Sequence, residues 1–340
     1  MHLRAMTKRD IPDAQCLKEI AGWNQTETDW ERFLEAGEAG CFVAELDGQV
    51  CGTATTISFE NRFAWVGMVL VDPACRGRGI GTRLLAQTIE YLDAQRIPCI
   101  KLDATPQGRP LYEKLGFLPE YEIERWTLRR TAVQAARTSE ARCCADFPPS
   151  LLKDILETDR EVFGANRSFL LKSLHQQAPA LTAGITSEGK LQGYTFGRKG
   201  SFADHLGPWM ANNATVARAL LERFLTCSIR DVLIVDWLKS NIVAGQLLRS
   251  FGFSYARPLT RMYRGENAHP GSVERVCAIL GPEFEMCIRD RMCPAALFDA
   301  LLNQIEGVPE GYKVAVVGRR RVVRVRIQSK KAAVLLARIA

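Results

Sequence analysis

The spacing of hydrophobic residues changes several times along the first 130 positions, and each change predicts a new element. Residues 11–23 and 28–36 carry apolar side chains at helical spacing. Residues 41–60 read as two strands around Asp47-Gly48, a dipeptide that favours a tight hairpin turn. Residues 63–71 are almost continuously apolar, which predicts a strand buried at the centre of its sheet. The rest of the pattern completes a mixed α/β unit that ends near Arg130. It predicts a short strand before residue 10, a helix at 82–95, a strand at 99–104, a short helix at 109–117 and a closing strand at 121–129.

The same order of elements returns after a break. Residues 131–148 lack periodicity and end in Pro148-Pro149, which indicates a linker. A second unit over 149–284 then gives helix, hairpin, strand, helix, strand and helix. Anchors of the two units align as Gly67 with Gly207, Leu84-Leu85 with Leu220-Leu221, Asp103 with Asp236, and Leu115-Gly116-Phe117 with Phe251-Gly252-Phe253. A tandem duplication explains this agreement.

Composition narrows the class of protein. With 340 residues and 47% apolar content, the chain can fill two cores. The net charge is +7, but much of the excess lies after position 318, so the two units are nearly neutral and nucleic acid is not the expected partner. The 11 cysteines show no CxxC or Cys/His spacing of the kind that zinc needs, so no metal site is expected. No leader and no run of roughly 18 apolar residues is seen, which predicts a cytoplasmic protein without a membrane partner.

The segment between the buried strand and the next helix is rich in glycine and arginine. It reads PACRGRGIGT over 73–82. The first amides of a helix have no partner inside the helix, and with the positive end of the helix dipole they form an anion site. Gly77, Gly79 and Gly81 carry no Cβ, so phosphate oxygens can approach the backbone closely. Arg76 and Arg78 can add charge-assisted contacts, and the segment is therefore shaped for a pyrophosphate.

The position of this segment strengthens the interpretation, because LYEKLGF follows at 111–117, after the next predicted strand. Arg76, Gly79 and Gly81 meet the coenzyme A motif of the GNAT acyl-CoA N-acyltransferases, and LYEKLGF resembles the next motif of that family. The resemblance implies an α/β fold with two tandem GNAT-type domains, the first catalytic (1–130) and the second divergent (149–284). It also implies acetyl-CoA as the co-substrate.

The resemblance also implies roles for individual residues. The cofactor's pyrophosphate would lie on the backbone amides of Gly77, Arg78, Gly79, Ile80, Gly81 and Thr82, with Arg76 beside them. Its pantetheine arm would pair with the backbone of Val69, Leu70 and Val71, since an open strand edge offers N–H and C=O groups to an amide-bearing ligand. The amide of Val69 or Leu70 would face the thioester carbonyl. Tyr112 would be the general acid, because a phenol can protonate a thiolate of comparable basicity.

The general base and the acceptor pocket are less constrained. Some family members carry a carboxylate at the position of Ile100, which cannot serve here. Asp103 and Glu60 remain as candidates acting through water, and Asp103 could equally orient the loop that follows it. Candidates for the wall of the acceptor pocket are Trp23, Phe63, Trp65, the segment GPWM at 207–210, Arg257 and Arg261.

The second unit lacks the parts that carry this chemistry. Gly67 and Leu84 are 17 residues apart, whereas Gly207 and Leu220 are 13 apart, so the cofactor segment is four residues short. That segment, MANNATVA, contains no glycine, and Leu248 stands at the position of Tyr112. The second unit is therefore expected to be degenerate and to complete the acceptor pocket or support the first.

The favoured function is transfer of an acetyl group to a primary amine of a small molecule. Acetylation of a protein N-terminus or lysine is one alternative, and a non-catalytic acyl-CoA sensor is another. The residues 285–340 are set apart as a basic tail, because MCIRDR at 286–291 resembles a translated sequencing adapter.

Overall fold

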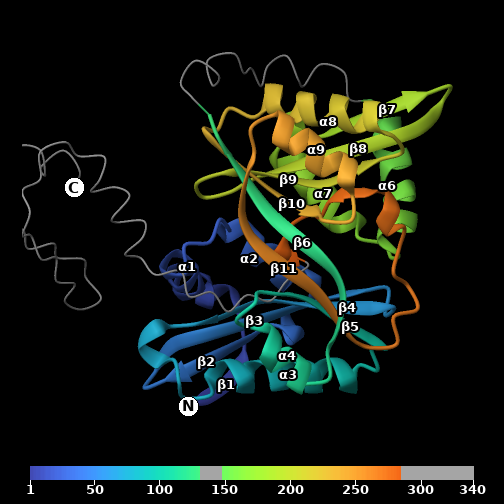
Figure 1. Cartoon of the computed structure of the whole chain (residues 1–340). Helices are drawn as coiled ribbons and strands as arrows, with labels where there is room; N and C mark the ends of the chain where they lie inside the picture. The colour runs from blue at the N-terminus through green and yellow to red at the C-terminus, as the bar shows by residue number, and fades with distance from the viewer. Residues whose placement is uncertain (131–147, 285–340) are drawn as a thin grey trace, which may run out of the picture. The chain divides into compact units, whose positions relative to one another are not determined.

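The computed structural model describes residues 1–130 and 148–284 (Figure 1). The first half contains β1 (His2–Ala5), α1 (Ile11–Ile20), α2 (Glu27–Gly37), β2 (Phe42–Leu46), β3 (Gln49–Phe59), β4 (Phe63–Val71), α3 (Ile80–Ala94), β5 (Cys99–Ala104), α4 (Arg109–Lys114) and β6 (Leu118–Arg129). The second half contains α6 (Pro149–Phe163), α7 (Ser168–Gln177), β7 (Ala183–Ser187), β8 (Lys190–Lys199), β9 (Asp204–Ala211), α8 (Ala214–Cys227), β10 (Val232–Leu238), α9 (Ile242–Ser250), β11 (Ser254–Gly265) and β12 (Val276–Ala278). The predicted mixed α/β class is confirmed.

Local signals in the sequence give the expected local structure. Asp47 and Gly48 both take positive φ, 53° and 76°, which is the backbone that a two-residue hairpin turn requires. β4 is buried along almost its whole length, as its continuous apolar pattern predicts. The helix expected from residue 82 begins at Ile80, and the alternation of strands and helices in the second half also follows the prediction.

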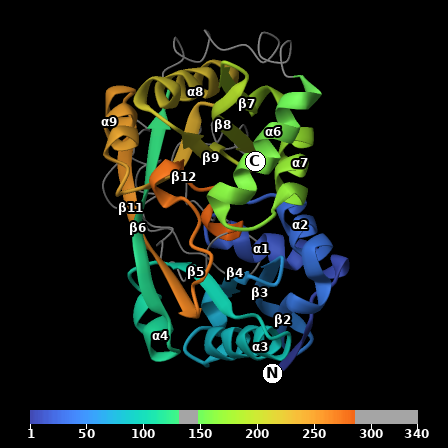
Figure 2. The ribbon, with the colours of Figure 1, turned by 90° about the vertical axis from the view of Figure 1, so that its right-hand side faces the viewer.

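The closing strands of the two halves are exchanged, and here the prediction is wrong. Within the described ranges, all strands belong to one sheet, in the order β1-β2-β3-β4-β5-β11-β6-β10-β12-β9-β8-β7. β6 was expected to close the first unit, but it pairs with β10 and β11, while β11 pairs with β5. The two long strands, green and orange, run side by side between the halves (Figures 1 and 2). The halves are therefore joined by backbone hydrogen bonds within one compact unit.

A repeated ion pair fixes each exchanged strand. Arg261 on β11 lies opposite Asp103 on β5, with Nε–Oδ1 and Nη2–Oδ2 distances of 2.7 and 2.8 Å. Arg125 on β6 lies opposite Asp236 on β10, with both distances 2.8 Å. Both carboxylates are fully buried. Two-point contacts of this kind fix geometry as well as supplying energy, so they fix the register of each exchanged strand.

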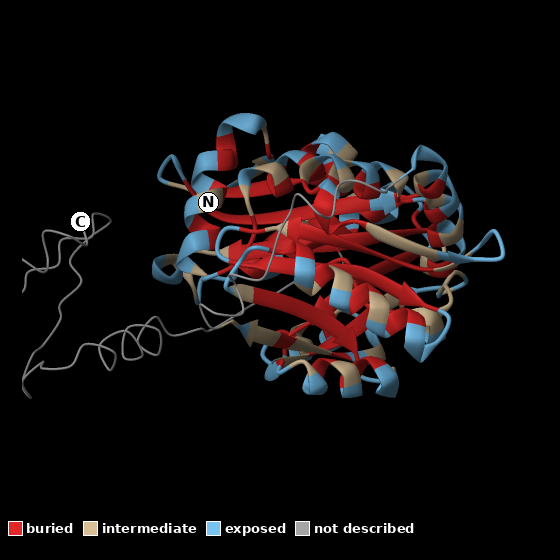
Figure 3. Cartoon of the chain, turned by 90° about the horizontal axis from the view of Figure 1, so that it is seen from above, coloured by how far each residue is buried: buried red, intermediate tan, exposed pale blue. Residues whose placement is uncertain are grey.

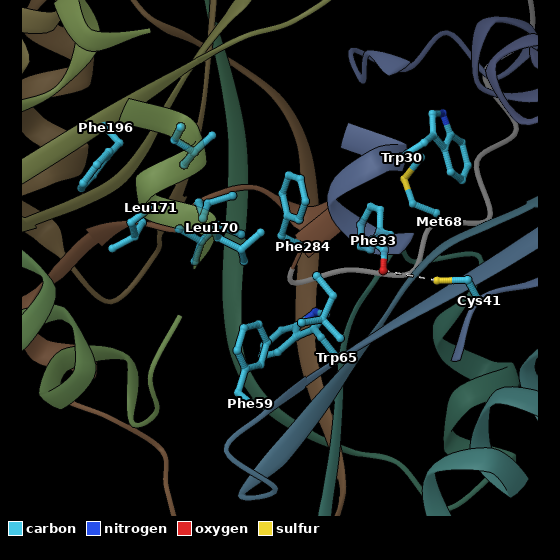
Figure 4. Close-up of a cluster of buried hydrophobic side chains, with 14 of the residues drawn as sticks. Trp30, Phe33, Cys41, Phe59, Trp65, Met68, Leu170, Leu171, Phe196 and Phe284 are labelled. Carbon is cyan, nitrogen blue, oxygen red and sulfur yellow. Dashed lines mark hydrogen bonds between the residues drawn. The ribbon is translucent and has the colours of Figure 1, made fainter. Parts of the chain in front are cut away.

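Three clusters of buried hydrophobic side chains pack between the sheet and the helices in the described part of the chain. One cluster packs under α3 and α4 of the first half, and a second packs under α8 and α9 of the second half. The third contains residues of both halves, and Figure 4 shows Phe59 and Trp65 of the first facing Leu170 and Phe284 of the second. Seen from above, buried strands fill the middle while exposed residues lie on the outer helices (Figure 3). The two halves thus share a core as well as a sheet.

Buried polar side chains also cross between the halves. The Asn24 amide nitrogen donates to the carbonyl of Ala203 at 3.0 Å, and the Asn24 amide oxygen accepts from the backbone N–H groups of Phe202 and Ala203. Arg198, fully buried, donates to Asp29 at 2.6 Å and also contacts Glu283. Losing one partner of such a buried contact leaves the other unsatisfied, so these residues favour a single relative placement of the halves.

Burial of His205 predicts a stability that falls in mild acid. Burial lowers the pKa of His205 below its ordinary value of 6.5, despite Asp236 Oδ2 lying 2.9 Å from its Nε2. The unfolded chain therefore binds this proton more readily, and the free energy of unfolding decreases as pH falls below about 6.5, by at most about 1.4 kcal/mol per pH unit. Urea unfolding between pH 5 and 8 measures the slope. His205→Gln should flatten the slope of unfolding free energy against pH, whereas the control His2→Gln, at an exposed position, should leave it unchanged. An equal slope in both variants would show that His205 is not its source.

Two predicted segments lie outside the described residues. They are the linker 131–148, apart from Pro148, and the tail 285–340. Within the described part of the chain, no helix has both the length and the apolar character needed to cross a bilayer.

Candidate active site

β4 and β5 diverge and leave one edge of β4 open. The two parallel strands pair only at Ala64 with Ile100 and at Trp65 with Lys101. From 66 to 71, β4 has no strand partner on that side among the described residues. Val69, Leu70 and Val71, predicted to pair with the pantetheine arm, lie on this open edge. Its backbone can therefore receive an extended, amide-bearing ligand.

A β-bulge that the sequence did not reveal lies at the same place. Between the pairs Thr53–Leu70 and Thr55–Gly67, β4 has one residue more than β3. Met68 takes a φ of 50°, and its carbonyl accepts a hydrogen bond from Thr53 Oγ1 at 2.7 Å. A bulge bends its strand and redirects nearby backbone groups. Positive φ at a residue other than glycine is a strain that clusters at functional sites, and here it lies where β4 leaves β5.

The glycine-rich segment forms an open turn before α3. Gly77 and Gly79 have φ of 78° and 74°, so both need the left-handed backbone that glycine adopts most easily. A Cβ built at either one meets no atom within 4 Å, so the space in front of them is clear. Gly79 precedes the helix and offers no side-chain cap, which leaves the amides of Ile80, Gly81 and Thr82 at the helix start. This geometry fits a bound pyrophosphate.

Gly81, Arg76 and Arg78 have different local surroundings from Gly77 and Gly79. Gly81 is helical, and a Cβ there would lie 3.4 Å from Val71 Cγ2, an ordinary contact. The Arg76 Nε donates to the Val71 carbonyl at 3.2 Å, so this side chain ties the turn to the end of β4. Arg78 is exposed beside the open amides and stays our predicted phosphate contact.

The equivalent place in the second half is filled by the chain itself. β9 and β10 pair in parallel from Asp204–Leu233 to Leu206–Val235. β12 then enters between them, pairing with both strands. The Asn213 side chain accepts from the amide of Val216 at 3.0 Å and so caps α8, whereas α3 has no such cap. The strand edge and the Val216 amide in the first turn of α8 are thus satisfied internally, which supports the predicted degeneracy of this half.

Tyr112 lies in α4, in the buried cluster that also contains Val69 of β4 and Ala104 of β5. Its side chain is 2% exposed, and its ring packs edge-on against Phe117 at 6.1 Å. A Cβ on Gly108 would come within 2.9 Å of the Tyr112 ring, so this glycine allows the ring to lie close to the start of α4. The ring is therefore fixed in the outer core of the first half, and the role of its hydroxyl as a proton donor stays a prediction.

The two candidate bases are engaged elsewhere. Both oxygens of Asp103 accept from Arg261, and the equivalent Asp236 makes the same contact in the half that lacks a cofactor segment. The repetition indicates a structural role for this aspartate. Glu60 accepts from Arg160 at 2.6 Å and from the Asn166 amide at 2.9 Å. The Arg160 contact, followed by the Asn166 contact, lowers the pKa of Glu60, which makes it a poorer proton acceptor.

A pocket lies between the halves and begins where β4 and β5 separate. Its cavity volume is about 30 Å³, and further space around it is open to solvent. Trp65 and Lys101, the last paired residues of the two strands, both line it. The other lining residues are Phe63, Tyr121, Val162, Phe163, Arg167, Tyr194, Pro208, Trp209, Met210, Arg261, Pro270, Val273, Val276, Ala278 and Ile279. Pockets of this kind commonly form at domain interfaces.

The sequence identified part of this lining. Phe63, Trp65, Arg261 and the segment 208–210 line the pocket as predicted, whereas Trp23 and Arg257 are not among the lining residues. Lys101 was missed, although a lysine inside the buried strand CIKLDA was a signal for it. Its ammonium lies 3.2 Å from Glu120, and burial lowers the pKa of this lysine. The other second-half lining residues were not identified from the sequence.

A valine at Gly79 is expected to weaken coenzyme A binding by roughly tenfold or more, because the Cβ and the strained backbone disturb the open turn. Isothermal titration with coenzyme A measures the affinity. Gly189→Val is a matched control, because Gly189 also has positive φ (71°) and open space around it but lies in the β7–β8 hairpin. Equal affinity in a folded Gly79→Val protein would place the cofactor elsewhere.

Comparisons with known proteins agree with this geometry. Residues 10–117 match the family model described as "Acetyltransferase (GNAT) family", and residues 155–278 match a second model, "Acetyltransferase (GNAT) domain". The chain is 23% identical over 264 residues to the holothin acyltransferase of Pseudoalteromonas sp. (strain SANK 73390), covering 77% of this chain and 86% of that protein.

Solved structures share the fold. A putative acetyltransferase from Pyrococcus horikoshii superposes with a TM-score of 0.68 at 23% identity, covering 83% of this chain and 95% of that one. A tandem GNAT protein from the clavulanic acid biosynthesis pathway superposes with a TM-score of 0.56 at 14% identity, covering 78% and 98%. With two family matches that together span most of the described residues, this chain belongs to the GNAT N-acyltransferases, as a tandem-domain member.

Proposed function

We propose that the chain transfers an acetyl group from acetyl-CoA to the primary amine of a small molecule. The observation that carries this proposal is the position of the second half. It packs over the face of the first-half sheet that bears Trp65 and Lys101, and a pocket lies between the halves there. An extended protein tail needs a long groove to lie in, whereas a small amine needs only a pocket.

Each element of the site has a defined task in this reaction. When bound, acetyl-CoA supplies the activated acyl group as a thioester. The amides of 80–82 and Arg78 hold its phosphates, and the open edge of β4 aligns its arm with the point of divergence. The amide of Val69 or Leu70 donates to the thioester carbonyl oxygen. Tyr112 gives its phenolic proton to the departing sulfur.

Asp103 acts in this scheme as a positioning residue. It holds Arg261 at the wall of the pocket, where the guanidinium also packs 4.5 Å from the Trp65 ring centroid. Proton removal from the amine then falls to water in the pocket or to the bulk solvent, because both oxygens of Asp103 are already hydrogen-bonded.

Release of free thiol from acetyl-CoA in the presence of a panel of small primary amines tests the proposal. We expect amine-dependent release and one coenzyme A bound per chain by calorimetry, since β12 fills the second site. Coenzyme A binding without thiol release from any amine indicates a sensor. Release with peptide amines alone favours a protein acceptor, and two bound coenzyme A molecules per chain would contradict the assignment of a single site.

A further inference from the structure

The polar side chains that line the pocket are mostly donors, and the two phenols among them can also accept. They are the indole groups of Trp65 and Trp209, the ammonium of Lys101 and the guanidinium groups of Arg167 and Arg261, together with the phenols of Tyr121 and Tyr194. Among the described residues that line the pocket, none carries a carboxylate or a carboxamide. The electrostatic complement of such a wall is a group that only accepts hydrogen bonds.

The carboxylates that neutralise these cations lie behind the wall. Lys101 contacts Glu120 at 3.2 Å, Arg167 contacts Asp159 at 2.8 Å, and Arg261 contacts Asp103 at 2.7 Å. The three carboxylate side chains are 10%, 1% and 0% exposed, and none of them lines the pocket. They fix the cations in orientation while leaving the positive groups nearest the cavity.

Two of the donors have no hydrogen-bond partner among the described residues. The indole N–H groups of Trp65 and Trp209 are buried and unpaired, in side chains that are 2% and 0% exposed. A buried donor without an acceptor is unfavourable, so these two N–H groups would gain from a bound acceptor atom. Both belong to the pocket wall, one from each half.

We propose that this pocket binds the acceptor through a carboxylate, so that the substrate is a small amine that also carries this group. Aromatic rings of Phe63 and Phe163 supply apolar walls that suit a ring or short chain between the amine and the carboxylate. The indole donors and the fixed cations supply charge-assisted hydrogen bonds to the carboxylate oxygens. This assignment of a substrate class rests on the proposed acetyl transfer.

Binding of phenylacetate and phenylacetamide tests the inference without any acyl transfer, because neither probe has an aliphatic amine. Calorimetry on the full chain should show phenylacetate binding roughly tenfold or more tightly than phenylacetamide, since hydrogen bonds to a charged group are the stronger ones. Equal affinities, or no binding of phenylacetate at about 10 mM, would overturn it.

Variants with a matched control locate the site. Trp209→Phe and Trp65→Phe keep an aromatic ring but remove an N–H, and each should weaken phenylacetate by roughly threefold to tenfold. Trp237→Phe is the control, because its indole N–H is also buried and unpaired but does not line the pocket. The same affinity in all three variants as in the wild type would count against the pocket.

Turnover then separates this inference from the proposed function. With acetyl-CoA, 4-(aminomethyl)benzoate should be acetylated with a kcat/KM roughly tenfold or more above that of its carboxamide. Selective phenylacetate binding without thiol release from any amine would retain the carboxylate site and reject acetyl transfer. Equal acetylation of the two amines would retain the transferase and reject the carboxylate site.

Discussion

Phenylalanine in place of Tyr112 is expected to lower kcat by roughly 10² to 10⁴ while the affinity for coenzyme A stays nearly unchanged. The ring packs against Phe117 within the first-half outer core, and phenylalanine keeps that packing. What is lost is the hydroxyl, and with it the proton for the departing thiolate. Steady-state kinetics together with calorimetry of coenzyme A separates the two effects.

Tyr91→Phe gives the matched control for that measurement. Tyr91 lies in α3, and its ring packs edge-on against Phe42 in the same half of the molecule. Loss of its hydroxyl should leave kcat within about twofold. If Tyr112→Phe retained full turnover, the tyrosine would be a packing residue of α4 and the proton would have to come from water.

Features set by neighbouring residues could be predicted from the sequence. The Asp47-Gly48 turn and the glycine-rich segment before α3 are local, because a backbone with positive φ must be supplied by the residues at that point. The missing glycines and the shorter segment of the second half likewise predicted a half without a cofactor site. Asn213 capping α8 is the structural counterpart of that absence.

Long-range pairing could not be predicted in the same way. β6 and β11 both read as the closing strand of their half, and the pattern of a strand identifies it without naming its partner. The observed pairing brings together residues as far apart as Arg261 and Asp103, which are separated by 158 positions. β12 was missed because three residues are too few for a periodic signal.

The lining of the pocket could likewise be predicted only in part. Aromatic residues of β4 and the segment 208–210 stood out by composition, so they could be proposed as a wall. Their assembly into one cavity depends on the exchanged strands, which bring Arg261 of β11 to the first half. Arg257, four residues earlier on the same strand, could not be distinguished from Arg261 by sequence. Its register places it opposite Arg125 on β6.

A chain ending at Arg130 is expected not to fold, although it contains every predicted cofactor residue. Its β5 would lose the neighbouring β11, and its β6 would lose both β10 and β11. The shared core would also be opened, including the stacked pair of Phe33 and Phe284 at 5.0 Å. Unpaired strand edges and a large apolar surface favour aggregation.

Expression of residues 1–130 alone and together with residues 148–284 tests this expectation. We expect the short fragment to be insoluble, or to lack a cooperative thermal transition by circular dichroism, and the co-expressed pieces to elute as one complex that binds coenzyme A. Asp236→Asn or Arg125→Met in the co-expressed pieces should weaken the complex, because each breaks the ion pair that joins β10 to β6. A monomeric fragment 1–130 that unfolds cooperatively and binds coenzyme A would show that β6 can close the sheet of its own half. The strand exchange would then not be required for the first half to fold.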